Sequence, residues 1–144
     1  MLHTETVEPR AFSLLERLMN LGFLNSFSLV GGTALSLRYG HRKSIDLDLF
    51  SVKKFDALSI VDKLRKEFGK NFGSESATAR WGIFCYIEGI KVDLIEHTHP
   101  MISNIETVDG IRMFGDPDIV AMKLNAILGR GKKKDFWDLY EEPV

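Results

Sequence analysis

The chain has 144 residues, of which 44% are hydrophobic and 27% are charged, and its formal net charge at pH 7 is −1. These values are typical of one globular domain and exclude a disordered or fibrous chain, while the near-zero charge argues neither for nor against a nucleic-acid partner. The single Cys85 excludes an internal disulfide and favours a buried thiol in a reducing compartment. No secretory signal and no run of roughly 18 apolar residues is present, so we expect a cytoplasmic protein without a membrane partner.

The first half of the chain predicts alternating helices and strands. A helix is expected over residues 9–21, with Pro9 in its first turn and Gly22 as its stop. Residues 27–32 (FSLVGG) predict a short buried strand, residues 33–39 a helix, and residues 44–50 (SIDLDLF) a strand with period-two alternation. Another helix is predicted over residues 55–68, with these side chains facing inward: Leu58, Val61, Leu64 and Phe68.

The second half predicts mainly strands, followed by helices. Residues 81–87 and 90–97 form a predicted hairpin around Glu88-Gly89, after a loop with a short strand at its end. One more short strand is expected within residues 110–115. A helix follows from Asp116, its predicted N-cap, and a last helix covers residues 132–142. The pattern indicates a mixed α/β (α+β) domain with one sheet.

Two aspartates, Asp46 and Asp48, lie one residue apart in an apolar strand pattern, although strands tend to avoid aspartate. Period-two alternation places both on the strand face opposite Ile45, Leu47 and Leu49. Two neighbouring carboxylates suit a hard cation such as Mg²⁺, which accepts one or two carboxylates together with substrate phosphates. The alternative is a half-buried strand whose polar face contacts water.

The glycine pair in LVGGTAL supplies a second component. Gly31 and Gly32 lie between a predicted strand and a helix that Thr33 can cap. Glycine allows a ligand to approach the backbone, and the free amides of a helix N-terminus favour an anion such as phosphate. The alternative is a plain tight turn. Combined with the D-x-D strand, the pattern predicts that the glycine turn binds phosphates and that the two aspartates bind their metal ion.

Asp93, in IKVDLIEH, is the candidate third carboxylate. A neighbouring strand can bring it beside Asp46 and Asp48, and three such carboxylates meet the needs of a two-metal phosphoryl-transfer site. Alone, Asp93 is equally a surface strand residue. The nearby His97 and His99 are interpreted as turn residues.

The C-terminal part contributes positive charge. Lys123 lies in an otherwise apolar stretch, which indicates either an ammonium group that reaches an anion or a lysine whose stem lies along the apolar surface. The run 132–134 is a solvated basic turn or, with Arg38, Arg42 and Lys43, a positive rim for a polyanion.

Taken together, VGGTALSLRYGHRKSIDLDLF, KVDLIEH and DIVAMKLNAILGRGKKKDFWDLY resemble the nucleotidyltransferase AbiEii/AbiGii toxin family of the polymerase-β-like superfamily. The resemblance runs from about residue 28 to 140. It implies a nucleotidyltransferase fold, a mixed β-sheet flanked by helices. We expect residues 1–144 to form a single nucleotidyltransferase domain that lacks the family's usual C-terminal helical extension.

The resemblance also implies roles for individual residues. Asp46, Asp48 and Asp93 match the catalytic, metal-binding carboxylates, and Asp135 matches an essential acidic residue of the family and a candidate base. The remaining matches concern the nucleotide: Gly31, Gly32, Thr33, Ser44, Lys123 and, as a plausible phosphate contact, Arg42.

The implied activity is transfer of an NMP group from an NTP to a hydroxyl of RNA (such as tRNA) or of a protein, with Mg²⁺ or Mn²⁺ as cofactor. Family members of this kind are toxins of type IV toxin–antitoxin systems, so the implied partners include a cognate antitoxin. The rival hypothesis is a non-catalytic nucleotide-binding or protein-interaction module of the same fold. A third reading, a generic α/β domain without a site, requires all these motifs to be coincidence.

Overall fold

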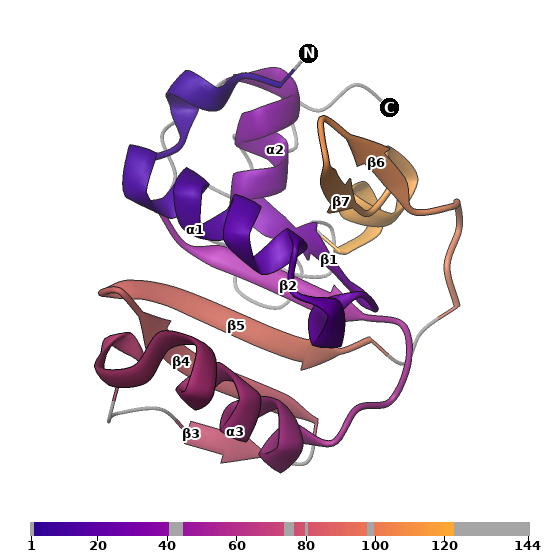
Figure 1. The fold of residues 1–144 in the computed structure, drawn as a ribbon. Helices are drawn as coiled ribbons and strands as arrows, with labels where there is room; N and C mark the ends of the chain where they lie inside the picture. Colours follow the sequence, from indigo (N-terminus) through magenta and orange to yellow (C-terminus); the bar gives the residue numbers. More distant parts are fainter. Residues whose placement is uncertain (1, 41–44, 74–76, 80, 98–99, 123–144) are drawn as a thin grey trace.

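The computed structural model describes residues 2–40, 45–73, 77–79, 81–97 and 100–122 (Figure 1). These residues form a mixed seven-stranded sheet with strand order β3-β4-β5-β2-β1-β7-β6. The strands are β1 (Phe27–Val30), β2 (Leu47–Ser51), β3 (Ala77–Ala79), β4 (Gly82–Ile87), β5 (Ile90–Glu96), β6 (Glu106–Val108) and β7 (Ile111–Met113). The predicted mixed α/β class is confirmed.

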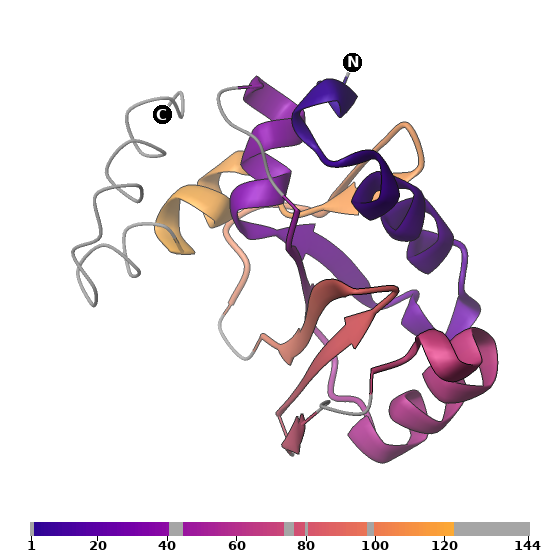
Figure 2. The ribbon, with the colours of Figure 1, turned by 90° about the vertical axis from the view of Figure 1, so that its left-hand side faces the viewer.

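Within the described ranges, three named α-helices and three short 3-10 turns accompany the sheet. The helices are α1 (Pro9–Met19), α2 (Gly31–Tyr39) and α3 (Ala57–Phe68), and the turns are η1 (Thr4–Thr6), η2 (Gly22–Leu24) and η3 (Gly69–Asn71). Residues 116–122 are also helical. Figure 2 shows α1 and α3 on one side of the sheet and residues 116–122 on the other. None of the helices in the described ranges is both long and apolar enough to cross a bilayer.

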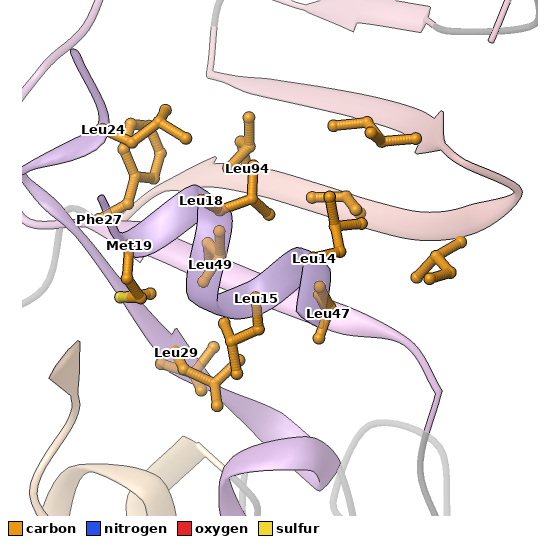
Figure 3. Close-up of a cluster of buried hydrophobic side chains, with 14 of the residues drawn as sticks. Leu14, Leu15, Leu18, Met19, Leu24, Phe27, Leu29, Leu47, Leu49 and Leu94 are labelled. Atoms are coloured by element: carbon orange, nitrogen blue, oxygen red, sulfur yellow. The ribbon is translucent and has the colours of Figure 1, made fainter. Parts of the chain in front are cut away.

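Alternation along the strands separates the two faces of the sheet. Leu47, Leu49, Val92 and Leu94 are fully buried and point toward α1 and α3. We call this side the helix face. Figure 3 shows Leu14, Leu15 and Leu18 of α1 packed against it. The intervening residues of β2, β5 and β4, which include Asp48, Asp93 and Phe84, point the other way, and we call that side the carboxylate face.

Helix α3 corrects one core prediction. Asp56 caps the helix by accepting a hydrogen bond from the Ser59 amide, and the buried side is formed by Ala57, Ile60, Val61, Leu64 and Phe68. Leu58 was expected to face inward but is 73% exposed. At about 100° per residue the centre of the buried side lies near Ala57, Leu64 and Phe68, and Leu58 points about 100° away from that centre, beyond the edge of the buried side.

Several element boundaries also differ from prediction. Helix α1 ends at Met19 and Gly22 begins a 3-10 turn, so the helix is shorter than expected. The hairpin of β4 and β5 is confirmed, and its turn residues Glu88 and Gly89 both have positive φ. Strand β6 was not predicted. It pairs with β7 through an Asp109-Gly110 turn, which is a hairpin signal that the sequence did contain.

Candidate active site

Asp48 and Asp93 are direct neighbours on the carboxylate face. Strands β2 and β5 run parallel, and their register places Asp48 opposite Asp93. Opposite residues of adjacent strands point to the same side of a sheet. The third carboxylate is therefore beside the D-x-D motif, as the sequence predicted, although the two residues are 45 positions apart.

Asp46 lies just outside the strand. The predicted strand began at Ser44, whereas β2 begins at Leu47, so Asp46 is an exposed residue of the preceding segment. Its carbonyl accepts a hydrogen bond from the Thr33 hydroxyl, which ties this segment to the first turn of α2. The negative charge of the Asp46 carboxylate still acts on Asp93, whose pKa it helps to raise.

Asp93 combines burial with an unsatisfied oxygen. The residue is only 9% exposed, and its Oδ1 is buried without a hydrogen-bond partner. Its Oδ2 lies 3.6 Å from the Lys91 ammonium nitrogen. Burial raises the pKa of the Asp93 carboxyl, and the charge of Lys91 partly opposes that shift. A buried carboxylate oxygen without a partner is costly for a fold, so this oxygen is a candidate ligand atom.

Lys91 is a site residue that the sequence interpretation missed. Its pKa is raised by the negative charge of Asp93 and, to a smaller degree, of Asp46 and Asp48. The charges of three carboxylates therefore act on one ammonium group, and Asp93 is the one that pairs with it. The signal was present in IKVDL, because residues 91 and 93 must share a strand face.

Gly31 brings the backbone of α2 close to Asp48. It has a φ of +75°, and a Cβ added there would lie 2.8 Å from the Asp48 Oδ2. The position therefore requires glycine for its conformation and for space. The glycines are the first residues of α2 rather than a turn before it, and Val30 is the N-cap. The expectation that Thr33 caps this helix is wrong, because the Thr33 hydroxyl donates to the Asp46 carbonyl.

Aromatic residues cover the carboxylate face beyond Asp48. Phe50 lies next along β2, and its ring packs edge-on against Phe114 at a centroid distance of 6.2 Å. The ring of His97 packs against both, at 5.8 and 5.2 Å. Helical residues 116–122 begin just after Phe114. Figure 2 shows them on the side of the sheet opposite α1 and α3, which is the side of the carboxylates. The carboxylates therefore have a wall on the β1 side.

Arg38 forms ion pairs inside the fold, whereas the sequence suggested that it could belong to a positive rim for a polyanion. Its guanidinium lies 2.8 Å from a Glu106 carboxylate oxygen and 3.4 Å from one of Asp116, and it donates to the Phe114 carbonyl. Only 14% of its side chain is exposed. Tyr39 donates a 2.6 Å hydrogen bond to Asp116. Asp116 is already helical and Gly115 accepts the first helical hydrogen bonds, so the predicted N-cap is one residue late.

The donor atoms at the site fit a hard divalent cation. Asp48 and Asp93 present carboxylate oxygens side by side, and the unpartnered Asp93 Oδ1 is the type of ligand that Mg²⁺ or Mn²⁺ accepts. No group of three or more His, Cys, Asp or Glu side chains in the described part of the chain is preassembled to hold a metal ion. Two carboxylates with substrate phosphates are nevertheless a usual ligand set for Mg²⁺.

Four predicted site residues lie outside the described residues: Arg42, Ser44, Lys123 and Asp135. The same holds for the basic run 132–134 and for His99. Their assigned roles stay predictions.

Comparison with known proteins supports the resemblance seen in the sequence. Residues 13–81 match the family model described as "Nucleotidyl transferase AbiEii toxin, Type IV TA system". An uncharacterized protein of Aquifex aeolicus (strain VF5) is 40% identical over 139 residues, which cover 88% of this chain and 62% of that protein. The chain thus spans less than two thirds of the length of this relative.

Solved structures place the fold among the nucleotidyltransferases. JHP933 from Helicobacter pylori superposes with a TM-score of 0.60 at 21% identity, over 92% of this chain and 66% of that chain. ANT(2")-Ia, solved in complex with adenylyl-2"-tobramycin, superposes with a TM-score of 0.62 at 13% identity, over 94% of this chain and 88% of that one. The predicted nucleotidyltransferase fold is confirmed.

Proposed function

From the match of residues 13–81 to the family model of the AbiEii nucleotidyltransferase toxin, we propose that this chain transfers an NMP group from an NTP to an acceptor hydroxyl and releases pyrophosphate. The observation that carries the proposal is the pairing of Asp48 with Asp93, one strand away from the glycine-initiated helix α2. ANT(2")-Ia, which shares the fold, was solved with a nucleotidylated product, and that supports the same class of reaction.

Each part of the site has a distinct task in this proposal. The amides at the N-terminus of α2 attract the triphosphate, and Gly31 lets it approach the backbone. Asp48 and Asp93, with Asp46 beside them, hold the divalent cation. When bound, such cations activate the attacking oxygen and stabilise the leaving pyrophosphate. Lys91 offsets the mutual repulsion of the carboxylates before substrate and cation bind.

The test is a transfer assay on the full chain. Purified protein is incubated with each labelled NTP, Mg²⁺ or Mn²⁺, and a total cell extract, and the labelled product is identified as RNA or protein. We expect Asp48→Asn to reduce transfer by at least about 100-fold, because it removes a cation ligand. Asp62→Asn on α3 is the matched control, since Asp62 is an exposed residue that pairs with Lys66. Full activity of Asp48→Asn would overturn the assignment.

The same assay tests the rival function. A non-catalytic nucleotide-binding module would bind NTP without labelling any acceptor, whereas the enzyme hypothesis requires a labelled product. The Asp93 carboxylate supports the enzyme, because a buried, unpartnered oxygen beside Asp48 suits a cation that takes part in transfer.

The family description supports a biological role as a toxin paired with an antitoxin. We expect expression of the chain to arrest cell growth and Asp48→Asn to relieve the arrest at equal protein levels. Growth arrest by both forms would separate toxicity from nucleotidyl transfer. The single-domain assignment of residues 1–144, the cytoplasmic location and the identity of the antitoxin stay predictions.

A further inference from the structure

The Lys91 ammonium group lies beside the carboxylates that are proposed to hold a divalent cation. Its nitrogen is 3.6 Å from the Asp93 Oδ2, and the negative charges of Asp46 and Asp48 act on it as well. An ammonium group and a divalent cation both reduce the repulsion between neighbouring carboxylates. Lys91 and a bound cation therefore compete for the same negative charge.

The Lys91–Asp93 pair joins a fixed carboxylate to a movable ammonium group. Asp93 is held in the middle of β5, and its Oδ1 is buried without a hydrogen-bond partner among the described residues. The Lys91 side chain is 48% exposed. A lysine has a flexible four-carbon stem, so its ammonium group can change position while the strand stays in place.

A cavity beside the pair gives the Lys91 side chain a second place to lie. Lys91 is opposite Tyr86 on β4. The cavity has a volume of about 250 Å³, and Lys91 lines it together with these residues among others: Glu8, Asp46 and Tyr86. An ammonium group that leaves Asp93 can therefore move into this cavity and stay near the carboxylates of Asp46 and Glu8.

We propose that Lys91 is a displaceable counter-ion, which pairs with Asp93 until a divalent cation binds and then moves into the adjoining cavity. The inference rests on the proposed function, because it concerns the cation of the proposed transfer reaction. Lys91 is a positioning residue, since it acts through Asp93 and sets how tightly the carboxylates hold the cation. Binding of Mg²⁺ or Mn²⁺ alone must break the Lys91–Asp93 pair, so its affinity is lowered.

Two simpler roles of Lys91 lead to different expectations. A lysine that only holds Asp93 in position would support cation binding, so its loss would weaken the affinity. A lysine that acts only through its charge at a distance would have the same effect as another cation of the same cavity. Arg10 is the matched control for that case, because it lines the cavity and pairs with Glu8.

The first test measures Mn²⁺ binding by calorimetry, on the full chain and without nucleotide. We expect Lys91→Met, which keeps an unbranched stem but removes the charge, to lower the Kd about 5-fold to 10-fold. Lys91→Arg should keep the Kd of the unsubstituted chain. Arg10→Met should change the Kd less than about 2-fold in about 1 M salt, where the Debye length is about 3 Å. An unchanged or higher Kd in Lys91→Met, or an equal decrease in Arg10→Met, would overturn the inference.

A double variant separates this inference from the proposed function. Asp48→Asn, added to Lys91→Met, should raise the Kd for Mn²⁺ at least about 10-fold, because it removes a cation ligand. If it does not, the cation binds elsewhere, and the carboxylate site of the proposed function fails together with the inference. If Asp48→Asn weakens binding but Lys91→Met does not strengthen it, the displacement is wrong and the carboxylate site stands.

The second test is a crystal structure of the chain with Mn²⁺, which locates the ion by its anomalous scattering and shows the Lys91 side chain. We expect the ion beside the Asp93 Oδ1, and the Lys91 nitrogen more than about 4 Å from the Oδ2, beyond the range of an ion pair. An ion bound at the carboxylates with the 3.6 Å contact intact would overturn the inference.

Discussion

The two faces of β2 and β5 are built from alternate residues of the same strands, and they differ in almost every physical respect. On the helix face, Leu47 and Leu49 are completely buried against α1. On the carboxylate face, Asp48 and Asp93 are negatively charged neighbours, and Asp93 has an oxygen without a partner. The first face stabilises the sheet, and the second carries a repulsion between carboxylates that Lys91 offsets in part and that a bound cation would relieve further.

This difference explains how a small domain can tolerate an unfavourable site. Burial of a leucine side chain contributes about 1.5–3 kcal/mol, and the helix face holds many such side chains. The burial of these leucines, one residue away in the same strands, offsets the repulsion between the carboxylates. Substitutions on the helix face should therefore act on stability, and those on the carboxylate face on ligand binding and activity.

The largest effect is expected for Leu49→Ala. Leu49 is fully buried, so its truncation should lower the free energy of unfolding by about 2–5 kcal/mol. Leu58→Ala, the exposed control, should change it by no more than about 0.5 kcal/mol. Urea unfolding measures both. Equal losses for the two variants would mean that the assignment of faces is wrong.

Substitution of Arg112 tests whether a polar side chain can stabilise the fold as strongly as a buried leucine. Its guanidinium donates to the carbonyls of Met19, Leu24 and Phe27, and burial lowers its pKa. Arg112→Ala should cost about 2–4 kcal/mol, because three carbonyls lose their charged donor. Arg112→Lys should recover part of that loss, since one ammonium cannot reach all three. Thermal unfolding that is unchanged in Arg112→Ala would refute the role.

Gly31→Ala links stability to the site. The positive φ should cost about 1–2 kcal/mol, and the new Cβ must displace the Asp48 carboxylate. We therefore expect reduced NTP binding in addition to a lower melting temperature. Gly110→Ala is the matched control, with a φ of +82° and open space around it. It should share the loss of stability but bind NTP normally. Calorimetry measures NTP binding by both variants, and equally weak binding by the two would contradict the role of Gly31.

The smallest expected effect is that of Asp93→Asn, which should raise the free energy of unfolding where the other substitutions lower it. Because the folded-state pKa of Asp93 is raised, its contribution to stability is present below the unfolded pKa and is lost as pH rises through the folded value. At pH 7, in the presence of a chelator, Asp93→Asn should therefore stabilise the fold, by less than about 1 kcal/mol after solvent screening. Near pH 3 the difference should vanish. A less stable variant at pH 7 would contradict the assignment, and urea unfolding at both pH values measures it.

Local patterns were sufficient to predict most elements of the fold and the face of the sheet on which Asp48 and Asp93 lie. The alternation in IDLDLF correctly assigned Asp48 and Leu49 to opposite faces, and Glu88-Gly89 correctly indicated a hairpin. Leu58 was misplaced because the short apolar stretch fits more than one helical side. Arg38 was misread because its partners Glu106 and Asp116 are distant in the sequence and cannot be identified from it.

By itself, the sequence determined which residues share a face, since side-chain direction follows from the two-residue period of a strand. It also determined that a glycine pair precedes a pair of aspartates. Only the tertiary structure decided that β5 pairs with β2 in the register that opposes Asp93 to Asp48 and Phe84 to Asp93. That register depends on how the apolar side chains of three strands pack together beneath α1 and α3, and local sequence does not encode long-range packing of this kind.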